Sequence, residues 1–131
     1  AMGYRARYVI DFTDHVWTEV WSEARARWLH ADSCENALDS PLVYCCGWKK
    51  KLTYIFALGP GEAVDVVNRY ITLEARPGVL ARRTLCDESW VSVRVAALDA
   101  TRRGRLAHAD LAARDARRES ERAELSEPAR D

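Results

Sequence analysis

Residues 12–35, FTDHVWTEVWSEARARWLHADSCE, hold the side chains of this sequence that are best suited to chemistry. His15, Asp32 and Cys34 stand among three tryptophans in this short stretch. A carboxylate beside an imidazole fixes its tautomer and stabilises its charged form, which makes the imidazole an effective general base. The elements that carry these residues decide whether they meet.

Alternating apolar residues predict strands over 5–12, 15–21 and 27–32. The polar SEAR segment predicts a four-residue turn between the second and third strands, in which Trp21 faces Ala26. In the hairpin that results, His15 lies opposite Asp32. Directly opposed residues share a face, with their Cβ atoms about 4.5–5.5 Å apart. The hairpin therefore predicts a His15–Asp32 pair, provided that the register holds.

Three other interpretations of these residues stay open. The first is a purely structural His–Asp contact, with the tryptophans as core residues. The second is a Zn²⁺ site, because His30, Asp32 and Cys34 alternate on one face with His15 nearby. The third is Cys34 as a nucleophile, although it follows Asp32 on the same segment and would have to turn back onto His15.

The rest of the chain indicates a second hairpin followed by helices. KLTYIFAL (51–58) reads as the most apolar strand, and the GPGE turn returns it into AVDVVNRYI (63–71). From about Ala81 the pattern predicts a helix up to Leu98, with Thr84 or Asp87 as the N-cap. Beyond Gly104, the mixed charges fit either a solvated helix or a disordered tail.

Composition limits the class of protein. With 131 residues the chain fits one globular domain, and its formal net charge of zero gives no electrostatic reason for binding nucleic acid or a membrane. No apolar run approaches the roughly 20 residues that span a bilayer. The four cysteines lack a disulfide spacing, and Cys45 and Cys46 are adjacent. We therefore expect reduced thiols in a cytosolic or nuclear protein.

Five blocks of the sequence resemble a known family. DHVWTEV, RWLHADSCE, PLVY, GWKKKLTYIFAL and VDVVNRY are similar, in this order, to the transglutaminase-like core of the cytoplasmic peptide:N-glycanases. The resemblance runs from about Gly3 to Tyr70 and continues more weakly through ARRT. It implies an α+β fold in which residues 1–100 form the antiparallel sheet half of a papain-like core, and residues 101–131 a charged helical or disordered tail.

The resemblance also implies an activity. The family removes N-linked glycans from misfolded glycoproteins by hydrolysing the amide, which turns Asn into Asp, and uses a Cys–His–Asp triad. On this pattern His15 is the general base and Asp32 orients it. Glu35 and Trp48 match positions that recognise the glycan. Trp17 and Trp28 are expected to line or support the cleft. Proteasome-shuttle proteins are further candidate partners.

The family's nucleophilic Cys lies before the His strand, and none of the four cysteines here matches its motif. The two CxxC pairs that bind the family's structural zinc are also expected upstream, so we expect no cofactor or metal within this chain. Because a thiolate is the attacking species, we expect these 131 residues alone to be inactive. Without the nucleophile helix we also expect an exposed apolar face.

Two other classes of function compete with the enzyme. One is a glycan-binding homologue that keeps Glu35 and Trp48 but has lost catalysis. The other is a scaffold, because transglutaminase-like folds without the triad also occur in DNA-damage-recognition proteins. The presence of both His15 and Asp32, and the zero net charge, argue against the scaffold.

Overall fold

A six-stranded antiparallel sheet in the order β4-β3-β2-β1-β5-β6 is the frame of the molecule. The computed structural model describes residues 5–129, so the outer ends of the two expected segments, 1–100 and 101–131, lie outside the described residues. The strands are β1 (Ala6–Asp11), β2 (His15–Ser22), β3 (Arg27–Asp32), β4 (Ala37–Leu38), β5 (Ile55–Gly59) and β6 (Glu62–Asp65). The first three strands confirm the predicted strands 5–12, 15–21 and 27–32.

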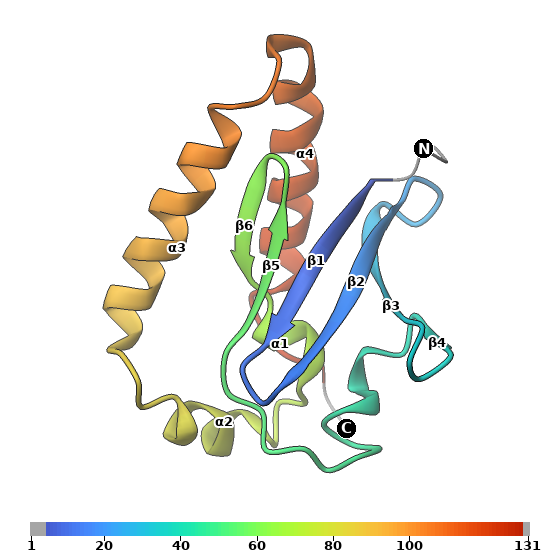
Figure 1. The fold of residues 1–131 in the computed structure, drawn as a ribbon, viewed down its shortest axis with the longest axis vertical. Helices are drawn as coiled ribbons and strands as arrows, with labels where there is room; N and C mark the ends of the chain where they lie inside the picture. The colour runs from blue at the N-terminus through green and yellow to red at the C-terminus, as the bar shows by residue number, and fades with distance from the viewer. Residues whose placement is uncertain (1–4, 130–131) are drawn as a thin grey trace.

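Helices occupy most of the second half of the described chain. They are η1 (Pro41–Val43), α1 (Val67–Tyr70), α2 (Arg76–Arg82), α3 (Glu88–Arg103) and α4 (His108–Glu124). Figure 1 shows α4 running behind β5 and β6, whereas α3 runs beside β6. The predicted α+β class is confirmed. Within residues 5–129, no helix has the length and apolar character that a membrane crossing requires.

The β2–β3 hairpin differs from the prediction by two residues in register. Trp21 pairs with Trp28 and Ser22 with Arg27, so the turn is residues 23–26 rather than SEAR. The Ser22 hydroxyl accepts a hydrogen bond from the Arg25 backbone, and Ala26 takes a φ of 51° to close the turn. Because side chains alternate with a period of two, a shift of two residues leaves each side chain on its predicted face.

The second hairpin is shorter than predicted. Residues 51–54 precede β5 without joining the sheet, and the predicted return strand 63–71 ends at Asp65. The Val67 backbone N–H donates to Asp65 Oδ1 at 3.1 Å, and the short helix α1 begins at Val67. The prediction of a strand over the last part of this segment is therefore wrong.

The predicted helix over 81–98 is divided in two. α2 starts earlier, with Pro77 in its first turn, where the missing N–H of proline costs nothing. The buried Arg83 then interrupts the helix, because its guanidinium pairs with Asp65 of β6 and Glu88 of α3. α3 begins after Asp87, which has extended dihedrals and occupies the predicted N-cap position.

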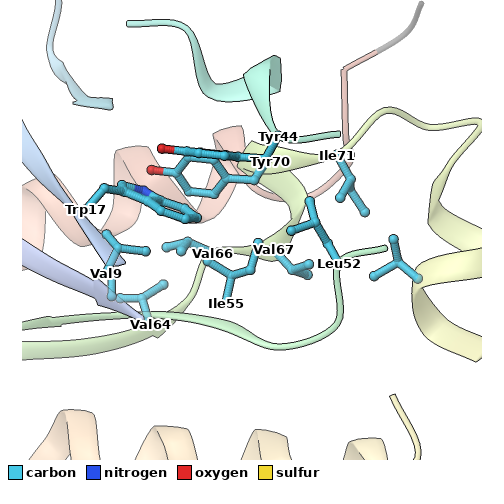
Figure 2. Close-up of a cluster of buried hydrophobic side chains, with 12 residues drawn as sticks. Val9, Trp17, Tyr44, Leu52, Ile55, Val64, Val66, Val67, Tyr70 and Ile71 are labelled. Carbon is cyan, nitrogen blue, oxygen red and sulfur yellow. The ribbon is translucent and has the colours of Figure 1, made fainter. Parts of the chain in front are cut away.

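The core lies on one face of the sheet. Figure 2 shows apolar side chains from the strands, from α1 and from the segment after η1 meeting there. The Trp17 and Tyr44 rings stack with their centroids 4.2 Å apart, and the Tyr70 ring meets Trp17 edge-on at 4.8 Å. Large aromatic rings bury much area for few rotatable bonds, so this group provides a rigid support under β2.

The opposite face of the sheet is only partly covered. Tyr8, Ile10 and Phe12 share this face, as the alternation predicts, but Tyr8 and Phe12 are each 52% exposed. An apolar groove of about 350 Å³ runs between this face and α3, where Phe56 and Trp90 line it. Apolar side chains are therefore exposed on this face of the described chain, and their link to a missing nucleophile helix stays a prediction.

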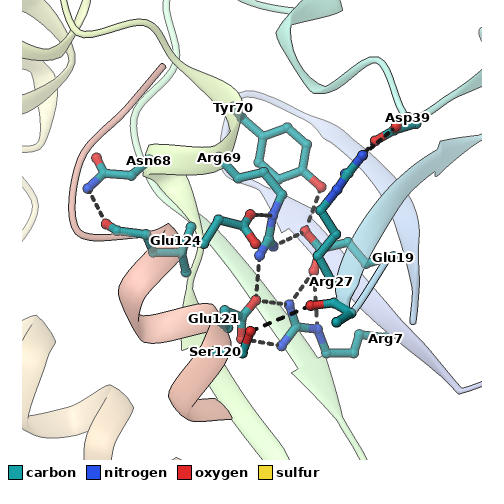
Figure 3. Close-up of polar contacts among 12 residues, drawn as sticks. Arg7, Glu19, Arg27, Asp39, Asn68, Arg69, Tyr70, Ser120, Glu121 and Glu124 are labelled. Atoms are coloured by element: carbon teal, nitrogen blue, oxygen red, sulfur yellow. Dashed lines mark hydrogen bonds and ion pairs between the residues drawn. The ribbon is translucent and has the colours of Figure 1, made fainter. Parts of the chain in front are cut away.

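A cluster of four buried charges joins the sheet to the helices. Glu19 and Glu121 alternate with Arg7 and Arg69, and each of these side chains is at most 4% exposed. Figure 3 shows the four groups meeting from β1, β2, α1 and α4. Arg69 lies 2.7 Å from Glu19 and 2.6 Å from Glu121, and the Tyr70 hydroxyl donates to Glu19. No pattern in the sequence predicted this cluster.

Residues 108–124 form α4, the helical alternative for the region beyond Gly104. The helix is not fully solvated, since Glu121 and Arg114 are buried on it. Arg114 donates to the Gly61 carbonyl oxygen at 3.0 Å and also pairs with Asp99 of α3. The charges of this region therefore serve to attach α4 to the β5–β6 turn and to α3.

We predict that Glu19→Gln lowers the free energy of unfolding by about 3–5 kcal/mol, because it leaves Arg7 and Arg69 buried with too little negative charge. Urea unfolding of the 131-residue chain measures this. Glu119→Gln is the matched control, since Glu119 pairs with Arg122 on the solvent side of α4. Wild-type stability for Glu19→Gln would show that the cluster does not hold the fold together.

We also predict that the stability of the chain falls between about pH 4.5 and pH 2. Burial alone raises the pKa of both carboxyls, but the arginines outweigh it, lowering the pKa of Glu19 and bringing that of Glu121 to about 2. Carboxyls with a depressed pKa stabilise the fold above their ordinary pKa of 4.5 and lose that contribution as the pH falls. Urea unfolding from pH 7 to pH 2 tests this, and a constant unfolding free energy down to pH 2 would contradict it.

Candidate active site

His15 and Asp32 meet at one end of the β2–β3 hairpin. His15 Nε2 lies 2.8 Å from Asp32 Oδ2, and the two side chains are 20% and 2% exposed. The pair survives the error in register because His15, at the start of β2, reaches Asp32 diagonally across the same face. The predicted contact is therefore confirmed, although its catalytic role remains a prediction.

Asp32 is held in its ionised form by several donors. Tyr44 Oη donates to Oδ2 at 2.5 Å, and the Cys34 backbone N–H donates to Oδ1 at 3.0 Å. Burial by itself raises the pKa of the Asp32 carboxyl, but the hydrogen bonds from Tyr44 and His15 outweigh it and lower the pKa. A buried carboxylate that stays charged at neutral pH can orient and stabilise an imidazolium.

The geometry of the pair leaves one imidazole nitrogen for chemistry. With Nε2 donating to Asp32, the neutral His15 ring carries its free lone pair on Nδ1. This is the nitrogen that can accept a proton from a nucleophile. Because the side chain is 20% exposed, a group that approaches from outside the core can reach the ring.

Aromatic rings surround His15 on several sides. Trp48 lies with its ring centroid 5.4 Å from that of His15, and 41% of its surface is exposed. Lys50 lies over the Trp48 ring at 5.6 Å and pairs with the buried Asp11 at 2.8 Å, which holds the loop that carries Trp48 against β1. The predicted binding residue Trp48 is therefore adjacent to the pair and open to solvent.

The other predicted binding residues take different places. Glu35 is half-buried in the turn after Asp32, and its backbone helps to lower the pKa of that carboxyl. Trp17 is buried in the core with its ring centroid 5.7 Å from that of His15. Trp28 is buried under the Arg7 guanidinium at 4.0 Å, within the charged cluster. A role in substrate binding stays a prediction for all three.

The zinc alternative is not supported. Across residues 5–129, no three His, Cys, Asp or Glu side chains are grouped so that they could hold a metal ion. Both ring nitrogens of His30 are engaged, one by Tyr44 and one by the Ser40 backbone. Cys34 is exposed, and its backbone contacts Asp32. The alternative of a zinc site formed by His15, His30, Asp32 and Cys34 is therefore contradicted for the described residues.

Tyr44 is a residue of the site for which the sequence predicted no role. This residue stands in the PLVY block, after η1, and no strand periodicity connects it to β3. His30 was expected opposite Trp17, but it pairs with Glu19 and contacts the Tyr44 hydroxyl at 2.7 Å. The alternation of His30 with Asp32 along β3 is the one sequence signal that places His30 beside the His15–Asp32 pair.

Three curated relatives of the chain have the same name. The sequence is 53% identical over 89 residues to the peptide-N(4)-(N-acetyl-beta-glucosaminyl)asparagine amidase of Gallus gallus, which covers 68% of this chain and 13% of that protein. The amidase of Homo sapiens is 52% identical over 89 residues, which again cover 68% of this chain and 13% of that protein. The amidase of Arabidopsis thaliana gives 41% over 123 residues, 94% of this chain and 17% of that protein. The chain thus spans less than a fifth of each relative.

A solved structure shares the fold. The crystal structure of Rad4–Rad23 bound to a 6-4 photoproduct UV lesion contains a chain that aligns with a TM-score of 0.53 and 18% identity. The alignment covers 95% of this chain and 32% of that one. The model of the Rad4 transglutaminase-like domain matches residues 11–126, which include β2, β3 and α4. The chain therefore belongs to the Rad4 transglutaminase-like domain family, with the peptide:N-glycanases among its relatives.

Proposed function

We propose that this domain supplies the general base and the orienting carboxylate of a peptide:N-glycanase. The observation that carries the proposal is the His15 Nε2–Asp32 Oδ2 contact of 2.8 Å, which leaves Nδ1 as the basic nitrogen. The substrate is the amide that joins an N-glycan to Asn in a misfolded glycoprotein. The products are a protein with Asp at that position and a glycosylamine.

The proposed chemistry follows from which atoms of the pair accept and donate protons. His15 Nδ1 takes the proton from a cysteine thiol, and the thiolate attacks the amide carbon to form a tetrahedral intermediate. The imidazolium, stabilised by Asp32, then protonates the glycosylamine nitrogen as it leaves and a thioester remains. Water, deprotonated by His15, hydrolyses the thioester to the Asp carboxyl and restores the thiol.

The nucleophile is proposed to come from a segment that these 131 residues do not include, because none of the four cysteines matches the family's motif. The structural zinc is proposed to bind in the same segment. The partially exposed His15 fits this arrangement, since a thiol presented from outside the described chain can approach its ring. The cytoplasm, and also the nucleus, is the proposed location.

The glycan is proposed to lie against Trp48. An exposed indole next to the catalytic pair can stack on the apolar face of a sugar ring, and the Glu35 carboxylate can accept its hydroxyl protons. The Trp48 backbone N–H donates to the Val43 carbonyl oxygen at 2.9 Å, which ties the backbone of this loop to η1. Sugar recognition and chemistry then share one end of the sheet.

We predict that the protein encoded by the complete transcript deglycosylates an N-glycopeptide, and that Asp32→Asn lowers its kcat by about 10³–10⁴-fold. His15→Ala should abolish turnover, and residues 1–131 alone should show none. Mass spectrometry of the Asn-to-Asp conversion measures each rate. Asp39→Asn is the control, because Asp39 pairs with Arg25 and Arg27 at the outer end of the hairpin. Full activity in His15→Ala would exclude the proposed base.

We also predict that the 131-residue chain binds chitobiose weakly and that Trp48→Ala abolishes the binding. Chemical-shift titration by NMR measures it. Trp90→Ala is the matched control, since Trp90 is a similarly exposed indole on α3, beside the opposite face of the sheet. Binding without turnover in the complete protein would favour the glycan-binding homologue. Absence of binding, with capture of a proteasome-shuttle or DNA-repair protein, would favour the scaffold.

A further inference from the structure

Behind Asp32, a chain of hydrogen bonds runs into the core. The Ser40 backbone N–H donates to His30 Nδ1 at 3.3 Å, and His30 Nε2 lies 2.7 Å from Tyr44 Oη. Tyr44 Oη lies 2.5 Å from Asp32 Oδ2, the same oxygen that contacts His15. The series of hydrogen bonds therefore ends on Asp32 Oδ2, the atom that orients His15.

The first contact of this hydrogen-bond series fixes the direction of the other two. His30 Nδ1 accepts from a backbone N–H, so the proton of the neutral ring must be on Nε2. That proton is donated to Tyr44 Oη, whose single proton is then available for the Asp32 carboxylate. Burial lowers the pKa of His30, although the Asp32 charge opposes this, so the ring stays neutral.

Packing holds the Tyr44 ring in place beside Asp32. Tyr44 is fully buried and His30 is 1% exposed. The Tyr44 ring is stacked on Trp17, and it meets the His30 ring edge-on at 5.4 Å. Figure 2 shows Tyr44 packed close to Trp17 and Tyr70, whose ring centroids lie 4.2 and 6.2 Å from that of Tyr44. With its ring held in place and its oxygen accepting from His30, the Tyr44 hydroxyl donates to Asp32, which is what orienting a carboxylate requires.

We propose that Tyr44, held by His30, is a positioning residue for Asp32. Its hydroxyl fixes Oδ2 in the place where this oxygen accepts from His15 Nε2, so that Nδ1 faces the nucleophile. Tyr44 acts through Asp32, and the proposal gives it no contact with substrate. The link to catalysis rests on the proposed function, whereas the hydrogen-bond chain itself does not.

The ionisable groups that face this arrangement come from several segments. His15 approaches Asp32 from β2, His30 stands on β3 itself, and Glu35 follows in the next turn. Burial raises the pKa of the Tyr44 phenol, and the nearby carboxylates of Asp32, Glu35 and Asp11 raise it further. The phenol therefore remains a neutral donor throughout the range in which Asp32 is ionised.

Tyr44→Phe tests the proposal in the 131-residue chain. The change removes one hydroxyl and keeps the ring stack, so the pKa of the Asp32 carboxyl should rise. We expect its acid dissociation constant to fall roughly tenfold, as for the loss of one hydrogen bond to a charged group. Titration of the ¹³C signal of the Asp32 carboxyl measures it.

Tyr70→Phe is the matched control. Tyr70 is also buried beside Trp17, and its hydroxyl donates to the Glu19 carboxylate at 2.6 Å. Both variants lose a buried hydroxyl-to-carboxylate bond, but only Tyr44→Phe should change the dissociation constant of Asp32. An unchanged constant in Tyr44→Phe, or an equal change in both variants, would overturn the positioning role.

The wild-type chain supplies a second test if Tyr44→Phe does not fold. The ¹⁵N shifts of the His30 ring should report a neutral imidazole with its proton on Nε2, with the exposed His108 as the reference. A proton on Nδ1, or a charged ring at neutral pH, would reverse the chain of donors and reject the proposal. Neither experiment depends on turnover. A shifted Asp32 dissociation constant without deglycosylation by the complete protein would therefore reject the proposed function alone.

Discussion

The alternation of Glu19 and Glu121 with Arg7 and Arg69 is the interaction on which the rest of this domain depends. Each charge taken singly would be too costly to remove from water, so these side chains can be buried only when their opposite charges arrive with them. The four residues come from β1, β2, α1 and α4. The sheet, the short helix and the final helix must therefore assemble together, and loss of one charge leaves the others unpaired.

The charged cluster and the candidate active site are two ends of one packed layer. Tyr70 donates to Glu19 and Tyr44 donates to Asp32, and both tyrosine rings pack against Trp17. The aromatic group thus joins a set of carboxylates that stabilises the fold to a carboxylate that can do chemistry. Because interiors are packed as densely as crystals, these contacts leave little free space between the two ends.

The fold of this chain and the residues of its candidate active site support different conclusions. At 18% identity, the aligned chain of the Rad4–Rad23 structure shares the arrangement of strands and helices, which by itself says nothing of the reaction. The proposed hydrolysis depends on the site, where an exposed indole and an imidazole with a free nitrogen lie beside an ionised carboxylate. His15, Asp32 and Trp48 supply these groups, and all three precede β5.

The sequence by itself determined the first three strands and the His15–Asp32 contact, because the period of two keeps each side chain on its face even when the register is wrong by two. The resemblance to a family pointed to Trp48. Only the tertiary structure decided the break at Arg83, the pairing of Arg7 with Glu121 across 114 residues, and the hydroxyl of Tyr44 behind Asp32. Local patterns record which face a residue occupies. They do not record which distant charge or donor will meet it, because that depends on how the whole chain closes around the core.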